Sequence, residues 1–223
     1  MNHQTPSIHL ASKPTYTLLL FIWLAFSWTI ALAQDTIDHP FTVKLVDAAL
    51  ERTHHEVTYD GGYRSIPYPM GDVPDHIGVC TDVVIRSYRS LGIDFQRLVH
   101  EDMKAHFSDY PNHWGLKKPD SNIDHRRVPN LQTFLTRHGQ VLPVTSQGSD
   151  YQAGDLVTWT VAGRLPHIGI VTGEKVPGTD RPMIVHNIGE GPKIEDMLFE
   201  FPITGHYRYE PQTTDRPATE LGP

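Results

Sequence analysis

The chain has one cysteine, Cys80, among 223 residues. A single cysteine excludes an internal disulfide, which needs two. In an exported protein, a thiol left without a partner is a candidate reactive group. The alternative is an inert thiol, because a free cysteine usually behaves as a small apolar core residue.

A dense run of basic residues is also missing. The sequence has 19 Lys and Arg against 26 Asp and Glu, which gives a formal net charge of −7. Proteins that bind nucleic acid neutralise phosphates with a basic surface. No nucleic-acid partner is therefore expected.

The apolar run near the N-terminus is too short for a membrane span. Lys13 precedes a run that begins at Leu18 and ends in the small-x-small pattern Ala31-Leu32-Ala33. A spanning helix needs about 20 consecutive apolar residues. We therefore predict that residues 1–33 are a cleaved secretory signal, the alternative being an uncleaved anchor.

The remaining chain is expected to form one exported domain, periplasmic or secreted, with no membrane span after cleavage. The length suits a single domain over residues 34–210. Residues 211–223 are polar and rich in proline, which predicts a flexible tail. We expect a monomer.

The first half of this domain shows helical spacing of apolar residues. Loops are predicted for residues 58–76, rich in Tyr, Gly and Pro, and for the long polar stretch 107–128. Gly92 and Gly139 each mark a helix end. The predicted helices span residues 41–55, 80–90, 94–106 and 128–138.

The second half shows short apolar runs separated by tight turns, a pattern that favours an antiparallel sheet. Helices followed by strands indicate the α+β class. The predicted strands span residues 141–144, 153–160, 166–171, 183–187 and 206–209.

Cys80 and two histidines form a candidate nucleophilic site. Amides at a helix start lower the pKa of a thiol, which favours a Cys80 thiolate. His167 opens an apolar strand and is a candidate base for it. His186 and Asn187 end the next strand, where a polar group could orient that base. Their side chains point to opposite faces, and the pattern leaves both candidates open.

Several polar residues are candidates for binding substrate. The loop tyrosines Tyr59, Tyr63 and Tyr68 either line a cleft and donate a hydrogen bond near the thiol or pack within the loop. Asp124 and Arg126, with Arg127, either bind a peptide carboxylate through bidentate contacts or form a structural ion-pair network. The predicted substrate-binding residues are Tyr63, Tyr68, Asp82, Asn187, Asp124 and Arg126.

A metal site is not expected. A recognised zinc motif places its histidines at fixed spacing from Cys or Glu partners. None is present around the histidines considered, which are His54, His55, His100, His106 and His125. No cofactor is expected either.

Two segments resemble the strand pair of the NlpC-type cell-wall peptidases, which belong to the papain-like superfamily. They are residues 153–159, with Gly-Asp-Leu-Val, and residues 167–173, with His-Ile-Gly-Ile. In that family a Cys begins the first core helix, and a polar residue, often His, follows on the strand after the base. Cys80, His167 and His186 fall at these positions in this order.

The resemblance implies a papain-like α+β fold, with N-terminal helices packed on an antiparallel sheet. It also implies a Cys-His-His triad acting on amides of cell-wall peptides: Cys80 attacks as thiolate, His167 is the base and His186 orients it. The Cys80 N–H and a loop tyrosine would hold the oxyanion. The partner would be a peptide or a peptidoglycan stem.

Three other blocks resemble the YijF family of exported bacterial proteins, a domain of unknown function (1287). They are residues 68–74, 78–82 and 122–130, and the resemblance extends over most of residues 40–210. Thr81-Asp82 stands where NlpC-type enzymes have Ser-Gly after the cysteine. The alternatives to a hydrolase are a module that binds wall peptides without turnover and an acyl transferase on the same fold.

Overall fold

The computed structural model describes Met1 and residues 41–211. The predicted signal beyond Met1, residues 34–40 of the predicted domain and the predicted tail beyond Pro211 lie outside the described residues. Within the described part, no helix has both the length and the apolar character that a membrane crossing requires.

Among the described residues, four α-helices lie where the periodicity predicts, although the first ends at Arg52 rather than at residue 55. Between α2 and α3, Gly92 adopts φ = 77°, a left-handed conformation suited to glycine, and Asp94 caps α3 by accepting from the Arg97 N–H at 3.1 Å. The helices are α1 (Phe41–Arg52), α2 (Cys80–Arg89), α3 (Phe95–His106) and α4 (Val128–His138).

One six-stranded antiparallel sheet follows, in the order β3-β8-β4-β5-β6-β7. The α+β class is therefore confirmed. The β4–β5 hairpin turns at Ala162 and Gly163, both with positive φ, as tight hairpin turns require. The strands are β3 (Gln140–Val141), β4 (Leu156–Val161), β5 (Leu165–Lys175), β6 (Pro182–His186), β7 (Lys193–Glu195) and β8 (Ile203–Arg208).

The strand predictions were right in position and imprecise in extent. The structure starts β4 at Leu156 rather than at 153, extends β5 to Lys175 and starts β8 at Ile203. Three strands were missed, one alone and two as a pair. One is β7, and the others are a parallel pair, β1 (Thr58–Tyr59) with β2 (Ile77–Gly78), inside and beside the predicted loop. Strands of two or three residues are too short to show a hydrophobic periodicity in the sequence.

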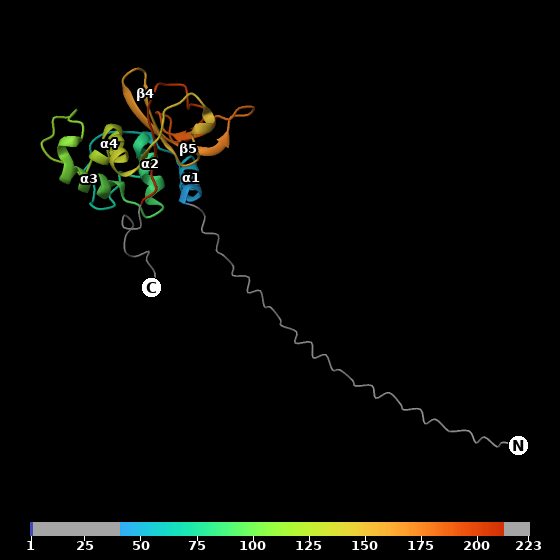
Figure 1. Cartoon of the computed structure of the whole chain (residues 1–223). Helices are drawn as coiled ribbons and strands as arrows, with labels where there is room; N and C mark the ends of the chain where they lie inside the picture. The colour runs from blue at the N-terminus through green and yellow to red at the C-terminus, as the bar shows by residue number, and fades with distance from the viewer. Residues whose placement is uncertain (2–40, 212–223) are drawn as a thin grey trace. The chain divides into compact units, whose positions relative to one another are not determined.

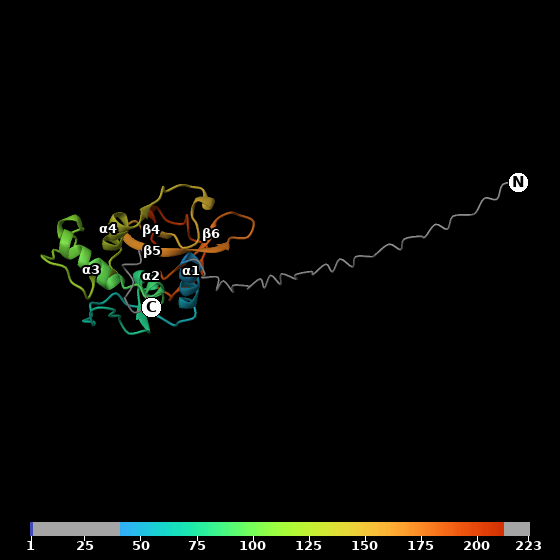
Figure 2. The same ribbon diagram turned by 60° about the horizontal axis from the view of Figure 1, so that its bottom comes forward.

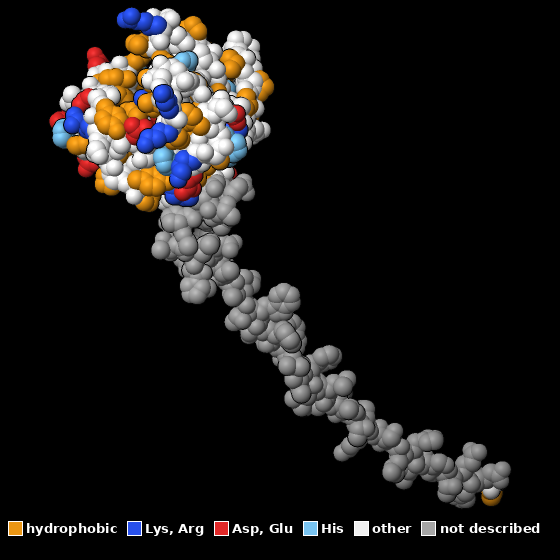
Figure 3. Space-filling model, turned by 90° about the vertical axis from the view of Figure 1, so that its left-hand side faces the viewer, with side chains coloured by type: hydrophobic (Ala, Val, Ile, Leu, Met, Phe, Trp, Pro, Cys, Tyr) orange, Lys and Arg blue, Asp and Glu red, His pale blue; other side chains and the backbone are white. Residues whose placement is uncertain are grey.

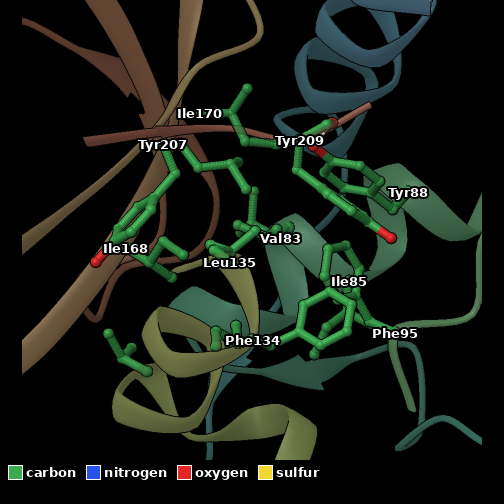
Figure 4. Close-up of a cluster of buried hydrophobic side chains, with 14 of the residues drawn as sticks. Val83, Ile85, Tyr88, Phe95, Phe134, Leu135, Ile168, Ile170, Tyr207 and Tyr209 are labelled. Atoms are coloured by element: carbon green, nitrogen blue, oxygen red, sulfur yellow. Dashed lines mark hydrogen bonds between the residues drawn. The ribbon is translucent and has the colours of Figure 1, made fainter. Parts of the chain in front are cut away.

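The helices pack against the face of the sheet that presents Ile168, Ile170 and Tyr207. Figures 1 and 2 show α1 and α2 beneath β5, with α3 and α4 beside them. Figure 4 shows side chains of α2 and α4 converging with these sheet residues in one apolar core. This packing holds the N-terminus of α2 against β5.

The other face of the sheet is covered by loops. Its buried cluster contains Trp159, Val171 and Ile184, packed against Tyr151 and Leu198. Trp159 is fully buried and donates its indole N–H to the Leu198 carbonyl at 2.9 Å. On the face of the domain shown in Figure 3, basic, acidic and hydrophobic side chains are interspersed.

Candidate active site

Cys80 is the first residue of α2, and its side chain is buried, with 4% exposed. Its sulfur accepts hydrogen bonds from the backbone N–H groups of Ile168 and Thr81 and from the Tyr59 hydroxyl. Ile168 follows His167 directly. The helix start and the candidate base are therefore joined through one backbone amide of β5.

The Ile168 amide is available because of the strand register. Val171 donates its N–H to Asp155, on the β4 side of β5, at 2.8 Å. In an antiparallel ladder the direction alternates, so the N–H of Ile168 points toward β6. Pairing with β6 starts only at Ile170, opposite Val185. Beyond the end of that ladder, the Cys80 sulfur satisfies the Ile168 donor.

Tyr59 is the loop tyrosine that reaches the thiol. Parallel pairing sets Tyr59 opposite Gly78, two residues before Cys80. Its hydroxyl accepts from the Cys80 N–H and donates to the Cys80 sulfur. Burial and the contact with Cys80 raise the pKa of Tyr59, so the hydroxyl stays protonated. Tyr59 was considered from the sequence but not chosen, because its strand depends on a partner almost twenty residues away.

Burial reverses the predicted state of the thiol. It raises the pKa of Cys80 to about 11, although the Ile168 and Thr81 amides and the Tyr59 hydroxyl lower it. The expected thiolate is therefore wrong for the resting protein. The prediction counted the amides at the helix start and omitted the desolvation of the charge, which here is the larger effect.

The two histidines meet on the face of the sheet that carries Trp159, the face covered by loops. His167 Nε2 lies 3.0 Å from His186 Nδ1, and both rings are buried. Gly169 lies between them on the same face. A Cβ there would lie 2.7 Å from Ile184 and 3.1 Å from the His186 Cβ, so glycine makes room for the pair. Burial lowers the pKa of His167 to about 3, and His186 adds to this.

Asn187 points the other way and does not contact His167. Its Oδ1 accepts from the Gly189 N–H at 3.1 Å, and its buried Nδ2 has no partner among the described residues. Of the two candidates that the sequence left open, His186 makes the hydrogen bond to His167.

Glu195, on β7, extends the chain of hydrogen bonds. Its Oε2 lies 2.9 Å from His186 Nε2, and Lys193 Nζ lies 3.2 Å from its Oε1. The His167 ring also packs beside Trp159, its partner across the β4–β5 pair, at 5.8 Å between centroids. Glu195 was missed from the sequence because β7 was not predicted.

Asp82 and Arg126 bind each other. The Arg126 guanidinium donates Nε–H and an Nη2–H to the two Asp82 oxygens at 2.9 and 2.8 Å. Both side chains are almost fully buried. Asp82 also accepts from the Val79 N–H at 2.6 Å, which caps α2. This geometry gives both residues a structural role at the helix start, not the predicted contact with substrate.

The other predicted binding residues lie on the connecting loops. Asp124 is buried and accepts from Arg127 at 2.9 Å, so the structural alternative describes it. Tyr63 is exposed and donates to Asp120 at 3.1 Å. Tyr68 is also exposed and stacks edge-on against His100 of α3. The Tyr63 hydroxyl donates to Asp120 and the Tyr68 hydroxyl donates to Glu101, at 3.5 Å, so neither is directed at Cys80.

Residues 46–209 match the family described as a domain of unknown function, DUF1287. The chain belongs to the DUF1287 family. It is also similar to the uncharacterized protein YijF of Escherichia coli (strain K12), with 51% identity over 166 residues, which cover 74% of this chain and 80% of that protein. The resemblance to the YijF family is therefore confirmed.

A cavity adjoins the histidine pair of this DUF1287 domain. It has a volume of about 540 Å³, and His186, Ile188 and Glu195 are among the residues that line it. It gives the end of the hydrogen-bond chain access to solvent. Among the described residues, no group of three His, Cys, Asp or Glu side chains is arranged to hold a metal ion.

The raised pKa of Cys80 predicts a specific alkylation profile. The rate with iodoacetamide should rise between pH 8 and 11 without reaching a plateau below pH 8, because only the thiolate reacts. Tyr59→Phe should move the profile to higher pH, since it removes a hydrogen bond that favours the thiolate. The unfolded protein in urea is the control, and a folded-state plateau below pH 8 would contradict the burial argument.

Proposed function

We propose that this protein is a cysteine hydrolase that cleaves amide bonds, with Cys80 as nucleophile, His167 as base and His186 as the residue that orients the base. One observation carries the proposal. The Cys80 sulfur accepts a hydrogen bond from the backbone N–H of Ile168, the residue after His167, and the His167 ring is hydrogen-bonded to His186. A nucleophile, a base and an orienting group in sequence are the general arrangement of such enzymes.

The first step is attack on a bound amide carbonyl. Because burial keeps both Cys80 and His167 neutral, the proton passes from sulfur to His167 as the C–S bond forms. Burial penalises each charge separately, whereas a thiolate beside an imidazolium is stabilised by mutual attraction. The Cys80 N–H and the Tyr59 hydroxyl adjoin the sulfur, and both would donate to the oxyanion once the substrate displaces their contacts with each other and with the sulfur.

The second step releases the amine and then the acid. The His167 imidazolium gives its proton to the leaving nitrogen, and the C–N bond breaks to leave a thioester on Cys80. Water, deprotonated by His167, then attacks the thioester carbonyl. The acid leaves, and the proton returns to the sulfur.

The substrate and compartment follow from the sequence. The resemblance to NlpC-type enzymes favours a papain-like form of the α+β fold and peptide amides of the bacterial cell wall as substrate. The predicted signal at residues 1–33 would export the protein from the cytoplasm. The peptides of the cell wall lie outside the cytoplasm, so the protein would reach them. The mechanism needs no cofactor, and a monomer holds every residue it uses.

The test is digestion of purified cell-wall sacculi. Wild-type protein should release peptide fragments that mass spectrometry detects, and Cys80→Ala should lower the release at least about a thousandfold, as loss of a nucleophile does. Circular dichroism should show that Cys80→Ala is folded, since the substitution removes one buried sulfur.

The surface variant His54→Gln is the matched control and should digest like wild type, because His54 is exposed and follows α1. If wild-type protein releases nothing, or Cys80→Ala releases as much, the proposal of a wall hydrolase is wrong. Binding to sacculi without release would instead support a binding module.

A further inference from the structure

Glu195 reaches the histidine pair because of how β7 pairs with β6. Glu195 lies opposite Ile184, two residues before His186, and both residues project from one face of the sheet. Its carboxylate therefore meets the His186 ring diagonally across the two strands, at 2.9 Å. The acidic side chain lies at the far end of a chain that runs through His186 to His167.

We propose that Glu195 is a positioning residue that sets the tautomers of His186 and His167, so that Nδ1 of His167 is left unprotonated to accept the Cys80 proton. The inference rests on the proposed function. It assigns a role to Glu195, which is connected to the base His167 by two successive hydrogen bonds.

The proton positions follow from which groups can donate. A carboxylate only accepts hydrogen bonds, so His186 Nε2 must carry the proton in its contact with Glu195. A neutral imidazole has one N–H, and His186 Nδ1 is therefore an acceptor. His167 Nε2, 3.0 Å away, must then donate to it. The lone pair of His167 is left on Nδ1.

Loss of the carboxylate would release this constraint. His186 could then carry its proton on Nδ1 and donate it to His167 Nε2. In that arrangement the His167 proton would occupy Nδ1, where the proton of Cys80 has to go. His167 acquires a positive charge when it takes the thiol proton. The Glu195 carboxylate stabilises that charge through the intervening His186 ring.

Other charged groups surround the same place. Lys193 lies between Glu195 and Glu190, with Nζ 3.2 Å from Glu195, and Asp196 and Glu200 line the same cavity. Of the charged side chains that line it, Glu195 is the one within hydrogen-bond distance of the His186 ring. Glu190, which contacts Lys193 and is exposed, offers a matched carboxylate for comparison.

The first test is nitrogen-15 NMR of protein labelled at histidine, which needs no substrate. In wild type, both His167 and His186 should be protonated at Nε2 and not at Nδ1. In Glu195→Ala, His186 should show a mixture of tautomers, whereas Glu195→Gln, which keeps an oxygen acceptor, should retain part of the wild-type signal. Glu190→Ala should match wild type.

The second test is the rate of fragment release from sacculi. Glu195→Ala should lower it about tenfold to a hundredfold, less than the loss of a residue that contacts the base directly. In Glu195→Ala, the acidic limb of the pH–rate profile should move to lower pH, because Glu195 raises the pKa of His186 in the wild-type protein. Glu195→Gln should recover part of the rate, and Glu190→Ala should keep all of it.

Two results would overturn the inference: Nδ1 protonation of His186 in wild type, or identical histidine tautomers in wild type and Glu195→Ala. A protein that releases no fragments but shows the expected tautomers would refute the proposed function and support the assignment of Glu195. The two failures are thus distinguishable.

Discussion

Asp82→Ala should lower the free energy of unfolding by about 3–5 kcal/mol, because it leaves the buried Arg126 guanidinium without its carboxylate. The same substitution removes the cap of α2, since Asp82 accepts from the Val79 N–H. Urea denaturation followed by circular dichroism measures the change, with the slope of the transition expected to stay constant.

Two variants make this result specific. Glu101→Ala breaks the exposed pair with Arg97 on α3, and such pairs contribute about 1 kcal/mol or less. The double variant Asp82→Ala with Arg126→Met removes both buried charges and should be more stable than Asp82→Ala alone. If Asp82→Ala is within about 1 kcal/mol of wild type, the pair does not hold the helix start.

Stability should fall markedly between pH 7 and pH 5. Burial lowers the pKa of His125 and of His167 from 6.5 to about 3, so the unfolded chain binds protons that the folded protein excludes. The stability linked to each ring is complete above about pH 6.5 and is lost as the pH falls toward 3. At pH 5, the exclusion of a proton from each of these two rings should lower the free energy of unfolding by about 2 kcal/mol relative to pH 7.

Chemical denaturation at the two pH values measures this loss within each variant, so changes in packing cancel. His125→Leu should reduce the difference between pH 7 and pH 5 by about 2 kcal/mol, because one excluded proton site is gone. His54→Gln, which replaces an exposed histidine, should keep the wild-type difference. Equal losses in His125→Leu and wild type would show that His125 is not the group responsible.

Local patterns in the sequence were enough for the framework of the domain. The apolar spacing after Cys80 predicted α2, and the apolar run after His167 predicted β5, because each depends on residues that are neighbours in the chain. Helical spacing in the first half, followed by short strands in the second half, led to the α+β class. The order of Cys80, His167 and His186 along these elements could also be read directly.

The composition of the site depended on contacts between distant segments. Tyr59 was considered but passed over for Tyr63 and Tyr68, because its place beside Cys80 comes from a two-residue parallel pair. Asp82 and Arg126 were read as binding residues, because their mutual burial joins segments over forty residues apart. No periodicity reports such pairings.

The sequence by itself determined which residues could form a nucleophilic site: a lone cysteine at a helix start and histidines on two strands. The tertiary structure decided which of them meet and in what protonation state. Register and side-chain direction selected His186 over Asn187 and added Glu195. Burial made the Cys80 thiol neutral, because desolvation depends on what surrounds a group in space, and the neighbours of Cys80 in the chain indicated the opposite sign.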